Sequence, residues 1–221
     1  MIIVFSGMDG AGKSTQIDLV TSFLNKKKLH YYRVWSRGGY TKGFDVLKKI
    51  LRLFFGKKNL PSGKSAKRDK MFKNIFVTRL WIYLAIIDLI ILYGFVLRYK
   101  VMRGRVVLCD RYIGDTFIDF SLNFPKVKVH KLFLWKLLRV LSPKPELSFL
   151  FLCSPELSSK RSLIKKEPFP DSLDALKSRL AFYNTAEYFK GSNWVIIDGT
   201  ASIEKNFNII NSNLSKLHYE D

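Results

Sequence analysis

The sequence predicts an α/β fold in which five parallel strands form one sheet with helices on both faces. Two observations lead to this prediction. Five short runs of apolar and β-branched residues recur along the chain, separated by stretches with helical spacing of apolar residues. The first run is followed by a glycine-rich loop and then by a helical pattern. This alternation is typical of parallel sheets, whose ligands bind beyond the carboxyl ends of the strands.

Each predicted strand is a short apolar run that stops at a polar or turn-forming residue. The third run enters directly from Gly104, the fourth is closed by Ser154-Pro155, and the fifth is closed by Gly199. Glycine and proline are strong signals for the ends of regular elements. The five runs are residues 1–5, 30–35, 105–109, 147–153 and 194–198.

The loop after the first run carries the sequence Gly7-Met8-Asp9-Gly10-Ala11-Gly12-Lys13-Ser14-Thr15. Glycine, four residues and then Gly-Lys-Ser is the pattern of a phosphate-binding loop. In that motif successive backbone N–H groups and a helix N-terminus point at a polyphosphate. Lys13 is expected to neutralise the β- and γ-phosphates, and the Ser14 hydroxyl to ligate Mg²⁺. The sequence therefore predicts binding of a nucleoside triphosphate.

A second motif, Asp110-Arg111-Tyr112, follows the third run. A carboxylate at the carboxyl end of a buried strand is the usual means by which a phosphate-loop enzyme orients Mg²⁺ through its water shell. Arg111 can bind a second phosphate group with two parallel hydrogen bonds. The alternative is a salt bridge between the two residues that only caps the strand.

Composition limits the cellular setting. The chain has 221 residues, enough for one well-buried domain, and a formal charge of +20 that predicts attraction to polyanions. Cys109 and Cys153 each end an apolar run, so we expect reduced core residues and a cytoplasmic protein. The phosphate loop begins so close to Met1 that no signal peptide is expected.

At these motifs the chain resembles the thymidylate kinase family. The resemblance rests first on residues 9–16 and 104–112, and it extends to about residue 210. Weaker matches are Pro155-Glu156, Lys160-Arg161, Glu167, Asn193-Trp194 and Ile197-Asp198-Gly199. The resemblance implies a P-loop kinase fold and transfer of the γ-phosphoryl of ATP to a nucleoside monophosphate, with dTMP as the first expectation. It also implies a homodimer, because that family dimerises through helices near residues 80–97.

The resemblance also assigns roles to individual residues. Asp9 would hydrogen-bond the acceptor's sugar hydroxyl, Arg111 would hold the acceptor phosphate, and Arg37 matches the basic residue after the second strand. A lid over ATP is expected at about 158–172. There Arg161, Lys165 and Lys166 are candidates for neutralising charge in the transition state.

The acceptor side departs from the family pattern. The family usually has Arg-Glu-Pro-Gly-Gly-Thr after the second strand, whereas this chain has Ser36-Arg37-Gly38-Gly39-Tyr40. Asp115 and Asp119 follow Tyr112, where the family places small polar residues. Leu89 stands where the family brings an arginine to the base, and Asp88 precedes it. Asp88 and Asp115 are therefore candidate acceptor contacts, while Asp119 has the alternative of an exposed helix position.

These departures keep two alternatives open. A sugar, a lipid-linked compound or another acceptor rich in hydroxyls or positively charged would suit the added carboxylates. A second alternative is an NTPase that associates with a membrane or nucleic acid and switches a partner interaction.

Two stretches before residue 104 indicate whether the protein contacts a second subunit, a membrane or a nucleic acid. Residues 80–97 form an apolar run with Asp88 at its centre. We expect a buried or subunit-interface helix there rather than a membrane span, because a carboxylate at mid-bilayer costs at least ~2.5 kcal/mol. Residues 41–74 are predicted to be a basic insertion that begins with an amphipathic helix. With the similar stretch 124–140, it suggests peripheral contact with an anionic membrane surface. No zinc site or stacking module indicates nucleic acid.

Overall fold

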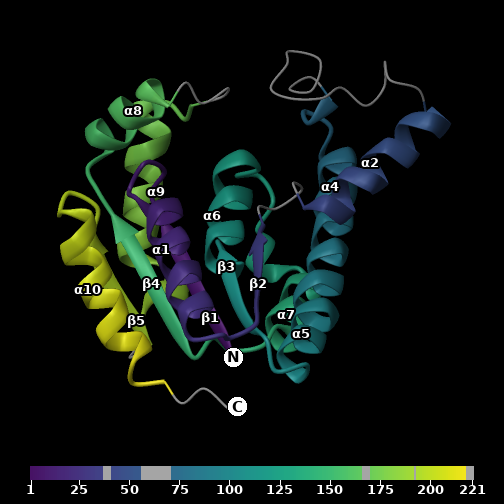
Figure 1. Cartoon of the computed structure of the whole chain (residues 1–221). Helices are drawn as coiled ribbons and strands as arrows, with labels where there is room; N and C mark the ends of the chain where they lie inside the picture. Colours follow the sequence, from purple (N-terminus) through teal and green to yellow (C-terminus); the bar gives the residue numbers. More distant parts are fainter. Residues whose placement is uncertain (37–40, 56–70, 166–169, 192, 218–221) are drawn as a thin grey trace.

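The computed structural model describes residues 1–36, 41–55, 71–165, 170–191 and 193–217. Figure 1 shows a central sheet flanked by helices, with the N-terminus near its lower edge. The strands are β1 (Ile2–Gly7), β2 (Tyr31–Trp35), β3 (Val106–Asp110), β4 (Leu147–Leu152) and β5 (Trp194–Asp198). All five coincide with the apolar runs predicted from the sequence.

The helices alternate with these strands along the chain. The α-helices are α1 (Lys13–Lys26), α2 (Lys42–Phe55), α4 (Ile75–Leu89), α5 (Arg98–Met102), α6 (Ile113–Asn123), α7 (Phe133–Leu141), α8 (Pro155–Ile164), α9 (Leu173–Thr185) and α10 (Ile203–Leu214). A π-helical segment, η1 (Ile90–Leu97), joins α4 to α5, and short 3₁₀ turns lie at η2 (Val129–Lys131) and η3 (Glu187–Phe189).

The sheet is parallel throughout and has the strand order β2-β3-β1-β4-β5. Its central strand β1 pairs with β3 on one side and β4 on the other. Because parallel strands share one direction, the residues after β1, β3 and β4 meet at the same edge of the sheet. That edge carries the phosphate loop and the Asp110-Arg111-Tyr112 motif.

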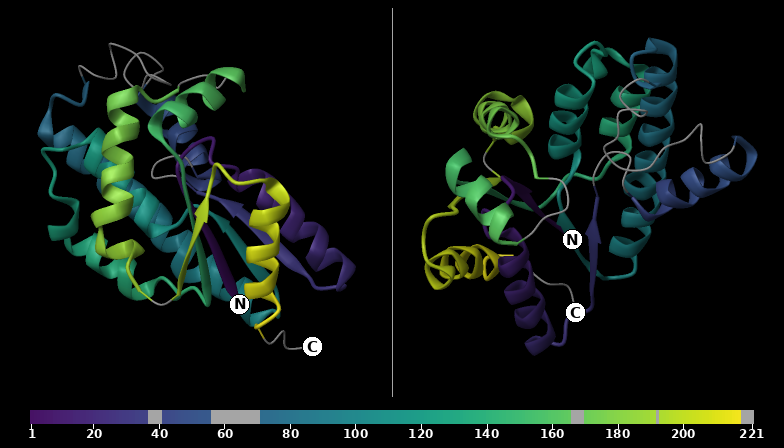
Figure 2. Two further views of the ribbon diagram at one scale, coloured as in Figure 1. Left: turned by 90° about the vertical axis from the view of Figure 1, so that its left-hand side faces the viewer. Right: turned by 90° about the horizontal axis from the view of Figure 1, so that it is seen from above.

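Two hydrophobic cores cover the two faces. Alternate residues of β1 point to opposite sides, so Ile3 and Phe5 lie in one core and Ile2 and Val4 in the other. Helices α1, α9 and α10 contribute to the first core, and α4, η1 and α7 to the second. Figure 2 shows α1 and α10 on one side of the sheet and α4 with α7 on the other. The predicted helices on both faces are confirmed.

Helices α4, η1 and α5 form one continuous apolar helix from Ile75 to Met102. By length and composition it could cross a membrane, but core helices of soluble proteins pass the same test. One face packs on the sheet through residues such as Ile86 and Leu97, which are fully buried. The opposite face exposes large apolar side chains at helical spacing, namely Phe76, Leu80, Ile87, Ile91, Phe95 and Met102. These six residues are called the apolar stripe below.

Other expectations have mixed outcomes. Both cysteines are free and buried, as predicted. Helix α2 forms within the basic insertion, with Phe44 buried and Val46 and Leu53 exposed. The alternative of an exposed helix position for Asp119 is excluded, because this side chain is buried against α9.

Candidate active site

The phosphate loop joins β1 to α1 and depends on glycine at its start. Gly7 has φ +128°, and a Cβ there would lie 2.0 Å from the carbonyl oxygen of Phe151 in β4. The Met8 N–H donates to that same oxygen at 2.9 Å. Gly10 and Gly12 also have positive φ, which residues with a side chain rarely adopt. The loop therefore takes its shape from backbone geometry that glycine permits and from its contact with β4.

Lys13 lies in the centre of this loop and is 7% exposed. Its ammonium donates to the carbonyl oxygens of Gly7 at 3.0 Å and Met8 at 2.6 Å. Burial lowers the pKa of Lys13 to about 8, and the neighbouring Arg111 acts in the same direction. Ser14 and Thr15 are exposed at the first turn of α1. This arrangement leaves a hydroxyl and the helix N-terminus open to a phosphate.

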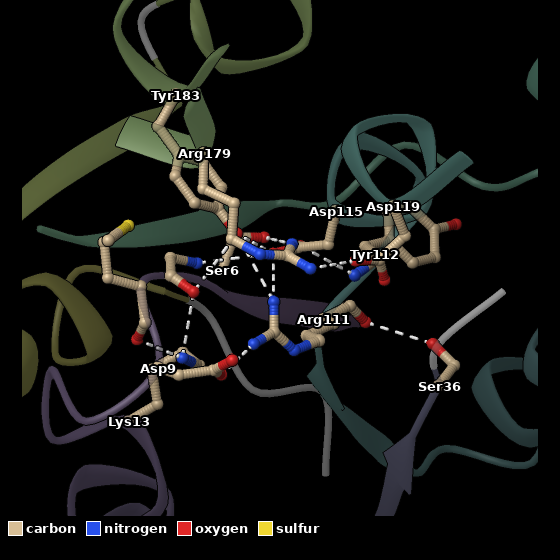
Figure 3. Close-up of polar contacts among 12 residues, drawn as sticks. Ser6, Asp9, Lys13, Ser36, Arg111, Tyr112, Asp115, Asp119, Arg179 and Tyr183 are labelled. Atoms are coloured by element: carbon tan, nitrogen blue, oxygen red, sulfur yellow. Dashed lines mark hydrogen bonds and ion pairs between the residues drawn. The ribbon is translucent and has the colours of Figure 1, made fainter. Parts of the chain in front are cut away.

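Arg111 follows β3 and is buried, with 3% of its side chain exposed. It pairs with Asp9 of the phosphate loop and with Asp115 of α6, the latter at 3.1 Å (Figure 3). Its backbone has φ +75°, an unusual value for a residue other than glycine. The neighbouring Asp110 is also buried, and burial raises the pKa of its carboxyl against the opposing effect of Lys13 and Arg111. Asp110 and Arg111 thus face the phosphate loop, as strand order predicts.

Asp115 is the most connected residue of the site and is 1% exposed. One carboxylate oxygen accepts from Ser6 Oγ at 2.5 Å and from the Tyr112 N–H at 3.1 Å. The other accepts from Arg111 at 3.1 Å and from the Tyr183 hydroxyl at 2.7 Å. Asp115 therefore joins β1, the start of α6 and helix α9. Its oxygens face protein donors, so this geometry gives it contact with Arg111 rather than with open space.

A second buried arginine, Arg179 of α9, lies beside this cluster (Figure 3). It pairs with Asp119 at 2.6 Å and with Asp171 at 2.8 Å. These contacts fasten α9 to α6. Asp119 thus has an arginine partner, and the pair is a packed ionic contact in the wall of the site.

The segment predicted to be the lid begins in α8 and touches the phosphate loop. Ser158 Oγ donates to the Asp9 carbonyl oxygen at 2.7 Å. Arg161 Nη1 donates to the carbonyl oxygens of Gly10 and Gly199, both at 2.8 Å. Lys165 is exposed at the end of α8. Arg161 therefore braces the loop from outside, and its Nη1 group is engaged by backbone.

Asp88 lies on α4, away from the Arg111 cluster. Its carboxylate accepts a hydrogen bond from Thr41, whose hydroxyl also accepts from the Phe44 N–H at 3.0 Å. Burial raises the pKa of Asp88, while the bond from Thr41 opposes that shift. Asp88 thus ties α4 to the start of α2. Arg37, Lys166 and Glu167, also singled out from the sequence, lie outside the described residues.

Three contributors to the site were missed by the sequence reasoning. Ser6 and Tyr183 bind Asp115, and Arg179 pairs with Asp119. Ser6 had a signal, since it precedes the phosphate loop at the carboxyl end of the first strand. Tyr183 and Arg179 had none, because a helix pattern does not specify which distant residue a polar side chain meets.

The described residues contain no cluster of three His, Cys, Asp or Glu side chains that could hold a metal by itself. The oxygen donors beside the phosphate loop are of the kind that magnesium takes. Magnesium in nucleotide sites keeps several waters and takes only one or two protein ligands besides the phosphates. Ser14 and the carboxylates of Asp9 and Asp110 border the loop and could supply such ligands.

No family model matches the chain. Several curated proteins named thymidylate kinase are similar to it over most of its length. That of Bartonella henselae is 28% identical over 211 residues, which covers 91% of this chain and 89% of the relative. Those of Caldicellulosiruptor saccharolyticus (28% over 181 residues; 78% and 73% covered) and Plasmodium falciparum (23% over 226 residues; 99% and 91% covered) are similar as well.

The fold and the phosphate site together define a P-loop kinase of nucleotides. These relatives share one name, and two of them match more than nine tenths of the chain. Their similarity to the chain supports its assignment to the thymidylate kinase family.

The buried ammonium of Lys13 makes nucleotide binding sensitive to pH. Because its pKa is about 8 in the free protein, Lys13 loses its proton as the pH rises through this value. Bound phosphates favour the charged form, so binding takes up a proton in this range. We expect ATP affinity to fall by about tenfold per pH unit above the pKa. Calorimetric titrations from pH 7 to 9.5, in two buffers of different ionisation enthalpy, measure both quantities.

The control for this prediction is Lys13→Arg, whose guanidinium stays protonated throughout this range. Its binding should be weaker overall but should take up no proton. An unchanged dissociation constant for the wild type between pH 7 and 9.5 would contradict the prediction.

Asp115→Asn should destabilise the fold. The substitution leaves Arg111 buried with one carboxylate partner fewer, and breaking a buried ion pair typically costs about 3 kcal/mol. Urea unfolding followed by circular dichroism measures the change in the free energy of unfolding. The matched control is Asp18→Asn, which removes an exposed pair with Arg33 and should cost less than about 1 kcal/mol. Equal effects of the two substitutions would refute the structural role of Asp115.

Proposed function

We propose that this protein transfers the γ-phosphoryl group of ATP to dTMP. The observation that carries the proposal is the pairing of Arg111 with Asp9 of the phosphate loop. The pair holds a buried guanidinium beside the phosphate loop, which supports a role for Arg111 in binding the acceptor phosphate next to a bound triphosphate. The choice of dTMP rests on the relatives, which are named thymidylate kinases.

The residues of the site divide the work of phosphoryl transfer. The loop N–H groups and Lys13 would bind the β- and γ-phosphates, and Arg111 would hold the acceptor phosphate in line. Asp9 lies between these groups and would orient the acceptor sugar. Lys165, and Arg161 through the part of its guanidinium not bonded to the loop, would supply positive charge from the lid. When bound, Mg²⁺ supplies charge neutralisation between the phosphates, with Ser14 and Asp110 as its nearest candidates.

Alternative acceptors have lost part of their support. They were suggested by the added carboxylates, yet Asp115 and Asp119 pair with Arg111 and Arg179. A hydroxyl-rich or cationic acceptor therefore gains little from these two acids, and the relatives favour a nucleotide. The partner-switching NTPase has no observation in its favour beyond the basic charge.

We propose a cytoplasmic protein that acts as a single kinase domain over 1–221. The basic insertion at about 41–74 and the lid at about 158–172 are part of this proposal. Residues 56–70 of the insertion and 166–169 of the lid lie outside the described residues. Arg37, also outside them, is proposed as a second cation for the acceptor.

We also propose a homodimer formed through the apolar stripe of α4, η1 and α5. Six large apolar side chains on one helix face form a surface that soluble monomers seldom expose. A second copy would cover the stripe by pairing the same face symmetrically. The alternative to this dimer is peripheral contact with an anionic membrane through the basic helix α2.

Purified protein should release ADP from MgATP much faster when dTMP is present. The decisive measurement is coupled ADP release with no acceptor and then with dTMP, dUMP, dGMP and dCMP in turn. Lys13→Ala should lose at least about a hundredfold in turnover, because it removes a charge that stabilises the transition state. ATP binding without stimulation by any of the four nucleotides would reject the proposed function.

Ile91→Lys should turn the dimer into a monomer, because it places a charge in the middle of the apolar stripe. Light scattering after size exclusion measures the mass of wild type and variant at the same concentration. Ile196→Lys is the control, since Ile196 is equally apolar and exposed but lies on β5. A monomeric wild type would reject the dimer. Sedimentation with anionic liposomes that Ile91→Lys abolishes would assign the stripe to a membrane instead.

A further inference from the structure

The end of strand β2 is fastened to Arg111 by a buried serine. Ser36 is completely buried, and its N–H donates to the Asp110 carbonyl oxygen at 3.3 Å. Its hydroxyl donates to the Arg111 carbonyl oxygen at 3.3 Å. Figure 3 shows Ser36 reaching Arg111 from the side opposite to Asp9. Ser36 therefore joins the strand that leads to Arg37 with the backbone of the buried arginine.

A tyrosine from the long helix completes this connection. Tyr93 is completely buried, and its hydroxyl lies 2.5 Å from Ser36 Oγ. We assign the single proton of Ser36 to the Arg111 carbonyl oxygen, which can only accept, and this assignment makes Tyr93 the donor to Ser36. Burial raises the pKa of Tyr93, which keeps its hydroxyl protonated as a donor. The result is a directed chain from the Tyr93 hydroxyl through Ser36 to the carbonyl of Arg111.

The helix is widened where Tyr93 stands. Residues Ile90 to Leu97 form the π-helical segment η1, a rare conformation that often marks a functional position. At the next residue, Gly94, an added Cβ would lie 3.3 Å from Leu141 Cβ, so glycine allows close packing on α7. The Tyr93 ring packs against Tyr112 at a centroid distance of 4.6 Å. The widened segment and its neighbours therefore hold Tyr93 in one orientation.

Arg111 needs such support because of its backbone. Its φ of +75° is unfavourable for a residue with a Cβ. The Arg111 N–H donates to the Phe5 carbonyl oxygen at 2.9 Å, and its carbonyl accepts from Ser36. These two bonds hold the unusual conformation, from which the side chain reaches Asp9 and Asp115.

We propose that Tyr93 is a positioning residue for the acceptor, which acts through Ser36 to hold Arg111 in its left-handed conformation. The inference rests on the proposed function, because it assigns Arg111 to the acceptor phosphate. The inference adds a role for the helix of α4, η1 and α5 in acceptor binding. This role is indirect, because Tyr93 of η1 acts on Arg111 and not on the substrate.

Tyr93→Phe tests the proposal because it removes the hydroxyl and keeps the ring. The KM for dTMP should rise about tenfold, the value expected for loss of one buried hydrogen bond, while the KM for ATP stays within about twofold. Ser36→Ala should have the same effect, and the double variant should be no worse than either single one, since both break one chain. Tyr99→Phe is the matched control, because Tyr99 is half exposed on the same helix.

Amide hydrogen exchange gives a readout that does not depend on the acceptor. The Arg111 N–H should exchange at least about tenfold faster in Tyr93→Phe than in wild type or Tyr99→Phe, because loss of the chain loosens this turn. An unchanged exchange rate, or faster exchange with an unchanged KM for dTMP, would overturn the proposal. A wild type that does not phosphorylate dTMP would reject the proposed function instead. The exchange rate of the Arg111 N–H would then test by itself whether Tyr93 and Ser36 hold the Arg111 backbone.

Discussion

The arrangement of this site depends on burying the positive charge of Arg111. A guanidinium removed from water is costly unless carboxylates and hydrogen-bond acceptors surround it. Asp9 and Asp115 meet this need, and they come from the phosphate loop and from α6. Tyr183 adds a contact from α9. The charge of Arg111 therefore brings together the phosphate loop, α6 and α9.

The second arginine extends the same principle outward. Arg179 holds Asp119 of α6 and Asp171, which lies ahead of α9. Arg179 and its two aspartate partners therefore line this side of the Arg111 cluster with paired charges instead of apolar side chains. Such pairs contribute little net stability but are strongly destabilising when broken. A substitution of Arg179 should therefore be tolerated only together with a substitution of its aspartate partners.

The sequence was sufficient for the sheet and for the phosphate loop, but not for the pairing of the charges. Five apolar runs located all five strands. The three inner strands β1, β3 and β4 are buried on both faces and are therefore apolar along their length, whereas the edge strands β2 and β5 are only partly buried. Parallel strand order then placed Asp110 and Arg111 opposite the loop. Asp119 could not be placed in the same way, since its partner Arg179 is sixty residues away on another helix. The π-helical segment at Tyr93 also was not predicted, because the apolar run of residues 80–97 has the same pattern as an ordinary helix.

The close contact between Gly7 and β4 determines when the phosphate loop becomes ordered. The Phe151 carbonyl oxygen would lie 2.0 Å from a Cβ at Gly7, and it accepts from the Met8 N–H. The start of the loop is thus built into the sheet and becomes ordered as the sheet folds. A nucleotide then meets a preorganised cradle, and its binding energy is not spent on ordering backbone. More of that energy remains for aligning the bound phosphates.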